Sequence, residues 1–351
     1  MAETMKAANL YAPADIRVEQ VPVPVPSEGE VLIQVKGCGV CGSDISRLME
    51  TGTYSFPTIP GHEFSGVITQ LGPGVSDVRL GERVTVIPFL PCRRCAFCEI
   101  GEYQLCENYS YLGSRTDGAY AEYVVAPATN LLPLPEGVSF EMGAMTDPAA
   151  VALHAVRKLG IQAGDSVAVF GVGPIGVYAL EWAKILGAGA TIAIDIFAEK
   201  LSVAAQLGAD VCINSREEDP LERIMAATQG TGVNRSVEFA GHMVTQEQSL
   251  LATAKMGSIV WGGISHSPLP LQEKTVDAIL RRELTLVGSW NSSFARLCSD
   301  WATTLQFMAT GQIRGEEMIS HRLSLEELPD TFKMLLAREE YTGKVMFFPE
   351  R

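Results

Sequence analysis

Four cysteines in the first third of the 351-residue chain have the spacing of metal ligands. Cys92, Cys95, Cys98 and Cys106 follow the pattern Cys-x2-Cys-x2-Cys-x7-Cys. Thiolates at this spacing can surround one zinc ion tetrahedrally, and a closed shell of sulfur ligands is typical of structural zinc. We therefore predict a structural zinc site here, with no open coordination position for a substrate.

A second set of ligand side chains, Cys41 and the pair His62-Glu63, lies upstream of these cysteines. It mixes thiol, imidazole and carboxylate, as catalytic zinc sites do when one coordination position stays open for water or a substrate oxygen. If the protein is an enzyme, we expect its chemistry at this second set.

The composition limits the kind of protein that carries these sites. The chain has a formal net charge of −14, 47% hydrophobic and 19% charged residues. No run of Lys and Arg suits a nucleic-acid partner, and no stretch is apolar enough to span a membrane. The N-terminus lacks the basic start and apolar run of a signal peptide, so we expect a cytoplasmic protein whose eight cysteines are mostly metal ligands rather than disulfides.

The pattern of predicted strands and helices along the sequence indicates an α/β protein with two domains. Residues 1–150 are rich in short, Gly- and Pro-broken β segments, whereas residues 151–287 alternate strands and helices. The predicted strand 166–170, helix 175–186 and strand 191–194 form a βαβ unit, which implies a doubly wound parallel sheet. Residues 288–351 end in another β-like segment, so we expect them to complete the first domain.

A glycine fingerprint opens the predicted helix of this unit. In Gly171-Val-Gly173-Pro174-Ile175-Gly176 the glycines suit a tight turn, close approach of a pyrophosphate and close helix packing. Asp195 ends the next strand, where a carboxylate accepts ribose hydroxyls and repels a 2′-phosphate, and Lys200 follows it. The pattern predicts a dinucleotide site that prefers NAD. The alternative is glycines that only turn the chain beside an Asp that caps a helix.

Together these motifs resemble the zinc-dependent medium-chain alcohol dehydrogenase family, from Met5 to the end of the chain. The resemblance implies a GroES-like catalytic domain interrupted by a Rossmann domain. It also implies that Cys41 and His62 hold the catalytic zinc, with Glu63 as a ligand or near neighbour. Asp147 stands at the position of the family's variable fourth ligand, and it either binds zinc directly or acts through a water.

The same resemblance assigns roles to two residues that follow Cys41. Ser43 matches the hydroxyl that accepts the proton of the alcohol, whose pKa zinc lowers. The alternative for Ser43 is a turn or cap hydroxyl. Asp44 is expected to orient the site by hydrogen bonding.

Segments 88–91, 112–118 and 282–290 are most similar to the polyol-phosphate branch of the family, whose substrates include galactitol 1-phosphate. A phosphate needs a positive site, and Arg47, Arg115 and Lys344 are the candidates, although each is equally suited to being a solvated surface charge. We therefore expect oxidation of a secondary hydroxyl of a polyol or polyol phosphate to a ketone, with hydride transfer to NAD.

Two other hypotheses stay open at this point. An L-threonine or butanediol dehydrogenase would share the metals and the cofactor but would need no phosphate pocket. A non-catalytic protein would use NAD and zinc only for stability or sensing. The resemblance also implies a homodimer or homotetramer.

Overall fold

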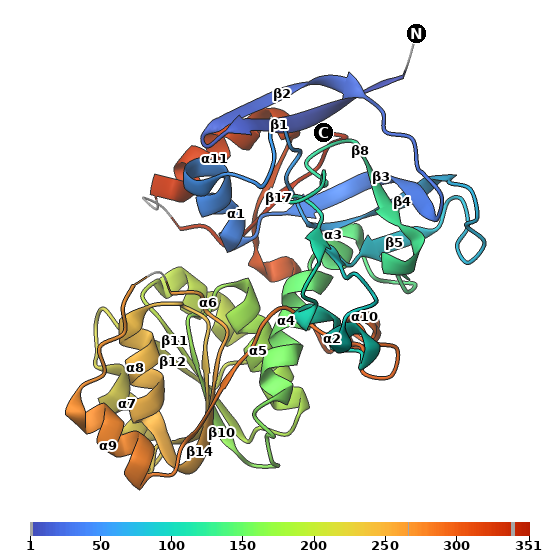
Figure 1. Cartoon of the computed structure of the whole chain (residues 1–351). Coiled ribbons are helices and arrows are strands. Elements are labelled where there is room, and N and C mark those ends of the chain that lie inside the picture. The colour runs from blue at the N-terminus through green and yellow to red at the C-terminus, as the bar shows by residue number, and fades with distance from the viewer. Residues whose placement is uncertain (1–2, 266, 338–340) are drawn as a thin grey trace. The chain divides into compact units, whose positions relative to one another are not determined.

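The structure is a computed structural model that describes residues 3–265, 267–337 and 341–351. The chain divides into two compact units (Figure 1). The first contains the residues up to Asp147 together with Phe294–Ala309 and Gly315–Arg351, and the second contains Pro148–Ser293 and Thr310–Arg314. The chain therefore leaves the first unit after Asp147, returns at Phe294, and contributes only the short segment Thr310–Arg314 to the second unit before it ends in the first.

The first unit is built on a seven-stranded sheet. Its strand order is β16-β17-β3-β4-β5-β9, and β8 pairs with β3 outside this path. All neighbours are antiparallel except β16 and β17. The strands are β3 (Glu30–Gly39), β4 (Glu63–Leu71), β5 (Arg83–Val86), β8 (Tyr123–Pro127), β9 (Leu131–Pro133), β16 (Ile319–Leu323) and β17 (Lys344–Phe347). Its core contains apolar side chains from β1, β3, β4, β5, β8, β17 and α11.

Two smaller sheets complete the first unit, one formed by β1 (Thr4–Ala12) and β2 (Asp15–Pro22), the other by β6 (Phe89–Leu90) and β7 (Ser110–Tyr111). Its short helices are α1 (Gly42–Ser46), η1 (Arg47–Thr51), α2 (Ala96–Glu99), η2 (Tyr103–Leu105), η3 (Ala128–Asn130), α3 (Phe140–Ala144), η4 (Glu316–Met318) and η5 (Leu325–Glu327). The longer ones are α10 (Asp300–Ala309) and α11 (Leu328–Ala337), while α4 (Thr146–Arg157) begins in the first unit and continues into the second.

The second unit contains a six-stranded parallel sheet in the order β12-β11-β10-β13-β14-β15. Helix α5 covers one face, while α7, α8 and α9 lie on the other (Figure 1). Its elements are β10 (Ser166–Phe170), α5 (Pro174–Ile185), β11 (Ala190–Asp195), α6 (Ala198–Gln206), β12 (Val211–Asn214), α7 (Pro220–Ala227), β13 (Val233–Glu238), α8 (Met243–Ala252), β14 (Thr253–Trp261), α9 (Glu273–Arg281) and β15 (Thr285–Gly288). This confirms the predicted doubly wound fold.

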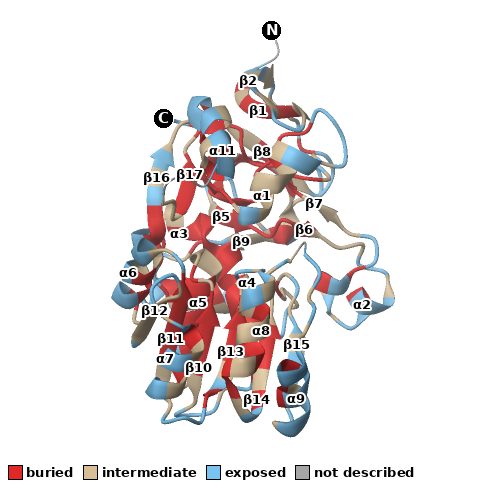
Figure 2. Ribbon diagram, turned by 90° about the vertical axis from the view of Figure 1, so that its left-hand side faces the viewer, coloured by how far each residue is buried: buried red, intermediate tan, exposed pale blue. Residues whose placement is uncertain are grey.

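The strand sequences explain this arrangement. Strands β10 and β11 are apolar along nearly their whole length and are buried (Figure 2), as expected for central strands covered on both faces. The strand order reverses at β10 and β13, and parallel sheets of this kind bind ligands at the carboxyl ends of the strands beside that point. In the described part of the chain, no helix is long and apolar enough to cross a membrane.

Candidate active site

Strand pairing in the first unit brings Cys41, His62 and Glu63 together. Strand β3 ends two residues before Cys41, and β4 begins at Glu63, with Gly39 opposite Glu63 in the antiparallel register. One ligand atom of each of the three side chains lies within 4.8 Å of the others. A thiolate, an imidazole and a carboxylate at this spacing suit a zinc ion that keeps one position open.

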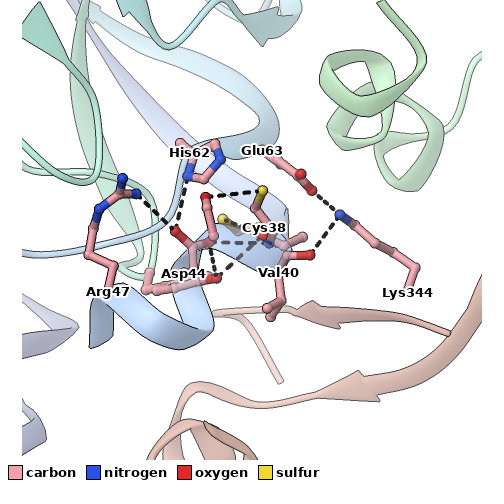
Figure 3. Close-up of polar contacts among 11 residues, drawn as sticks. Cys38, Val40, Asp44, Arg47, His62, Glu63 and Lys344 are labelled. Carbon is pink, nitrogen blue, oxygen red and sulfur yellow. Dashed lines mark hydrogen bonds and ion pairs between the residues drawn. The ribbon is translucent and has the colours of Figure 1, made fainter. Parts of the chain in front are cut away.

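Asp44 holds His62 in a fixed orientation (Figure 3). Its Oδ1 lies 3.2 Å from Nδ1 of His62, and its Oδ2 accepts hydrogen bonds from the Cys41 backbone N–H and the Tyr120 hydroxyl, both at 3.2 Å. Asp44 is fully buried and His62 is 3% exposed. Because Nδ1 is engaged by Asp44, Nε2 is left for a metal, the arrangement usual for histidine ligands.

The same contacts set the charge of the pair. Burial by itself would lower the pKa of His62, but the carboxylate of Asp44 and the sulfur of Cys41 raise it well above its usual value. The raised pKa favours the protonated imidazole when no metal is bound. Zinc competes with this proton, because only the neutral imidazole is a ligand.

Ser43 lies where the resemblance predicts a proton-accepting hydroxyl. It belongs to α1, which begins directly after Cys41, and its Oγ is 3.3 Å from the Cys41 sulfur. The Ser43 hydroxyl is therefore beside the metal-ligand set and is not fully buried. Its role in proton transfer stays a prediction.

The structure argues against the predicted phosphate contact of Lys344. This residue opens β17 and is 2% exposed. Its Nζ donates to the Val40 carbonyl at 2.8 Å and to Oε2 of Glu63 (Figure 3). An ammonium held by a buried carboxylate and a carbonyl is not available to an incoming phosphate, so Lys344 instead neutralises Glu63.

Asp147 lies close to the metal-ligand set without joining it. Its carboxylate is not among the three converging ligands, yet it is 6% exposed and its Oδ1 has no hydrogen-bond partner within the described chain. Burial, followed by the charge of Glu63, raises its pKa to about 7. A buried carboxylate without a partner fits a cation or a metal-bound water nearby, so whether Asp147 contacts zinc directly stays open.

The four cysteines of segment 92–106, which we call the cysteine lobe, also converge. Their sulfurs all lie within 4.8 Å of one another, around α2 and η2. The Cys92 N–H donates to the Cys106 sulfur at 3.2 Å. Backbone N–H groups of Glu107 and Cys98 lower the pKa of Cys95 to about 6, which favours the thiolate form that metals bind. This geometry fits the predicted tetrahedral zinc.

In the second unit, the glycine fingerprint forms the turn from β10 into α5. Gly171 has φ +87°, and a Cβ there would lie 2.6 Å from the Ala240 nitrogen. A Cβ on Gly176 would lie 2.0 Å from the Gly171 oxygen, whereas one on Gly173 would meet nothing within 4 Å. Gly173 precedes Pro174, the first residue of α5, so the helix N-terminus faces open space in which a pyrophosphate would bind.

Asp195 ends β11 beside this turn. Its carboxylate accepts hydrogen bonds from the N–H groups of Val172 at 2.9 Å, Ile196 at 2.8 Å and Phe197 at 3.1 Å. Asp195 therefore braces the loop before α6 without capping that helix, whose N-cap is Phe197. Carboxylate oxygens have further lone pairs, so the same side chain can still accept ribose hydroxyls. Lys200 lies with its Nζ 4.9 Å from the centre of the Phe197 ring.

The two arginines predicted to bind phosphate differ in their surroundings. The Arg47 guanidinium is 3.8 Å from Oδ1 of Asp44 (Figure 3). Arg115 instead lies between two aromatic rings, with its Cζ 4.0 Å from the centre of Tyr54 and 4.6 Å from that of Tyr109.

Two tyrosines that the sequence did not single out complete the site. Tyr120 binds Asp44, and a Cβ on Gly61 would lie 2.8 Å from its ring, which explains the glycine before His62. Tyr111 packs edge-on against His62 with ring centres 5.4 Å apart. Both follow the four cysteines, at the ends of segment 111–120, and no pattern in the sequence marked either of them as a site residue.

Comparisons with family models and with known proteins find matches along most of the chain. Residues 27–136 match the family model of the alcohol dehydrogenase GroES-like domain, and residues 174–310 match that of zinc-binding dehydrogenases. The chain is 35% identical to galactitol 1-phosphate 5-dehydrogenase of Escherichia coli (strain K12) over 343 residues, which covers 95% of this chain and 97% of the relative. It is 32% identical to L-threonine 3-dehydrogenase of Symbiobacterium thermophilum over 356 residues, covering 100% of this chain and 99% of the relative.

The fold is also similar to a solved structure with a bound cofactor. A zinc-binding dehydrogenase from Sinorhizobium meliloti 1021, crystallised with NADP, has a TM-score of 0.91 and 32% sequence identity to this chain. The similarity covers 99% of this chain and 100% of that one.

Proposed function

Because this chain belongs to the zinc-dependent medium-chain alcohol dehydrogenase family, we propose that it oxidises a secondary hydroxyl of a polyol or polyol phosphate to a ketone and transfers the hydride to NAD. The general activity, that of an NAD(P)-dependent zinc alcohol or polyol dehydrogenase, follows from the family and its relatives. That activity replaces the hypothesis of a non-catalytic zinc protein. The observation that carries the proposal is the convergence of Cys41, His62 and Glu63, with Ser43 beside them.

The residues of the site support this chemistry. Cys41, His62 and Glu63, with Asp147 nearby, would hold the catalytic zinc, which when bound supplies a Lewis acid that acidifies the substrate hydroxyl. Asp44 fixes the His62 ring, and Tyr120 and the Cys41 N–H in turn fix Asp44. Ser43, whose Oγ lies 3.3 Å from the Cys41 sulfur, would accept the hydroxyl proton. Lys344 compensates the charge of Glu63 without touching the substrate.

A separate closed zinc site is proposed for Cys92, Cys95, Cys98 and Cys106. Its sulfurs leave no open position, so its contribution is to folding rather than to turnover. Two zinc ions per chain are therefore expected, of which the ion at Cys41 is removed more readily by a chelator.

NAD is the proposed cofactor, with NADP used less well. The support for this preference is Asp195, a carboxylate at the ribose end of the predicted site, which would repel a 2′-phosphate. The relative crystallised with NADP makes the comparison of both cofactors an essential experiment. NAD should give a higher kcat/KM than NADP. Asp195→Ala should reduce the ratio of kcat/KM with NAD to kcat/KM with NADP. A higher kcat/KM with NADP would overturn the preference.

The substrate is tested by a screen that follows NADH formation at 340 nm with free and phosphorylated galactitol, arabitol and sorbitol. L-threonine and 2,3-butanediol belong in the same screen, because the threonine dehydrogenase relative is nearly as similar as the galactitol 1-phosphate relative. We expect a polyol or polyol phosphate to have the highest kcat/KM. Turnover of threonine or butanediol alone would favour the alternative.

We also propose that the enzyme forms a homodimer or homotetramer in the cytoplasm. Strand β15 is the last strand on one side of the parallel sheet, and three of its four residues are exposed. An open strand edge has free N–H and C=O groups that a second copy can pair with. Light scattering that gives the mass of a single chain would contradict this.

A further inference from the structure

We propose that Arg115, fixed between the rings of Tyr54 and Tyr109, binds the phosphate of the substrate and makes this enzyme prefer phosphorylated over free polyols. This inference rests on the proposed function and names the substrate class of the same site. It concerns the one predicted phosphate-binding cation whose charge no carboxylate compensates among the described residues.

The three predicted cations are distinguished by their partners. Lys344 is buried against Glu63, and Arg47 lies 3.8 Å from the carboxylate of Asp44, which also binds His62. Within residues 3–265, 267–337 and 341–351, the Arg115 side chain has no ion pair and no hydrogen bond, and it is partly exposed. Its charge is therefore available to an anion, whereas Lys344 is held by Glu63 and Arg47 lies beside the carboxylate of Asp44.

The aromatic contacts fix Arg115 without using its donors. Both contacts are made by tyrosine rings, whose centres lie 4.0 Å and 4.6 Å from Cζ. A guanidinium that covers a ring face keeps its N–H groups, which lie in its own plane, available for other partners. Those in-plane donors match two oxygens of a phosphate. A guanidinium fixed before the ligand arrives loses less conformational entropy on binding than a mobile one.

Arg115 is connected to the metal-ligand set by a turn and a row of aromatic rings. Its backbone N–H donates to the Tyr111 carbonyl at 3.0 Å, and the Tyr111 ring packs on His62 with centres 5.4 Å apart. Tyr109, which stacks on Arg115, also stacks on Phe89 with centres 4.5 Å apart, and Phe89 packs against Tyr111 at 6.0 Å.

This row connects the guanidinium to His62 through Tyr111. In a polyol phosphate several carbon atoms lie between the phosphate and the secondary hydroxyl that is oxidised, so the two groups bind at different points. A free polyol of the same length would reach the same ligands and leave Arg115 without a partner. Arg115 should therefore affect the phosphorylated substrate selectively.

The test is steady-state kinetics of wild type and Arg115→Gln with galactitol 1-phosphate and with galactitol. Loss of a charge-assisted hydrogen-bond pair should lower kcat/KM for the phosphorylated substrate by about 10- to 100-fold, mostly through KM. The value for free galactitol should change less than about twofold, since the Arg115 side chain makes no other polar contact to the residues that the structure describes. Arg115→Lys should recover part of the loss, because it keeps the charge but not the bidentate geometry.

Arg17→Gln is the matched control. The Arg17 guanidinium also covers a tyrosine ring, with its Cζ 4.5 Å from the centre of Tyr11, but it is paired with Asp15. This variant should behave as wild type with both substrates. Tyr54→Leu, which removes one side of the clamp, should raise KM for the phosphorylated substrate several-fold, whereas Tyr54→Phe should not.

The possible results separate the two proposals. If wild type shows no preference for galactitol 1-phosphate, or Arg115→Gln reduces both activities equally, the inference about Arg115 is wrong while the dehydrogenase function stands. Equal losses accompanied by a lower Tm would assign Arg115 a purely structural role. If wild type oxidises no polyol at all, the proposed function itself fails and takes this inference with it.

Discussion

The buried pair of Lys344 and Glu63 gives a direct test of how the first unit is assembled. Lys344→Met removes the ammonium and leaves the Glu63 carboxylate, 3% exposed, without its ion-pair partner. Removing one partner of a buried ion pair typically costs about 3–5 kcal/mol of unfolding free energy. For a unit of this size that corresponds to a decrease in Tm on the order of 10 °C.

The experiment is thermal unfolding of wild type, Lys344→Met and the double variant Lys344→Met/Glu63→Gln, each after dialysis against a chelator. The double variant should recover most of the loss, because it no longer buries an unpaired charge. Adding zinc should also recover part of the stability of the single variant, since a cation beside Glu63 compensates the same charge.

Lys333→Met is the matched control, because the ion pair of Lys333 with Asp330 is exposed at 65% and 89%. Exposed pairs are worth about 0–1 kcal/mol, so this variant should have nearly the Tm of wild type. If Lys344→Met unfolds like wild type and instead loses affinity only for a phosphorylated substrate, Lys344 binds substrate and the account of the buried pair is wrong.

Three further results are expected. Asp44→Asn should weaken zinc binding by about 10- to 100-fold, measured by competition with a chromogenic chelator, because His62 loses the group that orients it; unchanged affinity would contradict this role. Gly173→Val should raise the KD for NAD, measured by calorimetry, at unchanged zinc content, since a side chain would fill the space left for the pyrophosphate; equal affinity would place the cofactor elsewhere. Folding raises the pKa of Asp147 from 3.8 to about 7, so between these two pH values the folded protein keeps a proton that the unfolded chain has lost. The metal-free wild type should therefore lose stability relative to Asp147→Asn as the pH rises from about 4 to about 7. Parallel stability curves for the two proteins would refute the buried placement of Asp147.

Local spacing was enough to predict some parts of the site. The four cysteines of the lobe and the glycines from Gly171 to Gly176 act within a few residues of one another, so their pattern reflects their geometry. The buried apolar strand before the fingerprint and the helix after it were predicted for the same reason. Asp44 was expected to orient the site, and its contact with His62 depends only on the paired ends of β3 and β4.

Contacts between distant segments could not be predicted in this way. Lys344 and Glu63 are 281 residues apart, and they meet because β17 pairs with β3 and β3 pairs with β4. From the sequence alone Lys344 was a candidate phosphate contact or a solvated surface charge, and neither interpretation places it against Glu63. The Tyr120 hydroxyl binds an aspartate 76 residues earlier, and no local pattern marks that contact.

The central claim is tested most directly by measuring zinc content and NADH formation on the same preparations of wild type, Cys41→Ser and Cys95→Ser. Wild type should contain two zinc ions per chain and reduce NAD with a polyol or polyol phosphate. Cys41→Ser should keep one zinc, bind NAD and have no turnover, while Cys95→Ser should lose stability. Full turnover by Cys41→Ser, at any zinc content, would contradict the claim that the metal held by Cys41 and His62 carries the reaction.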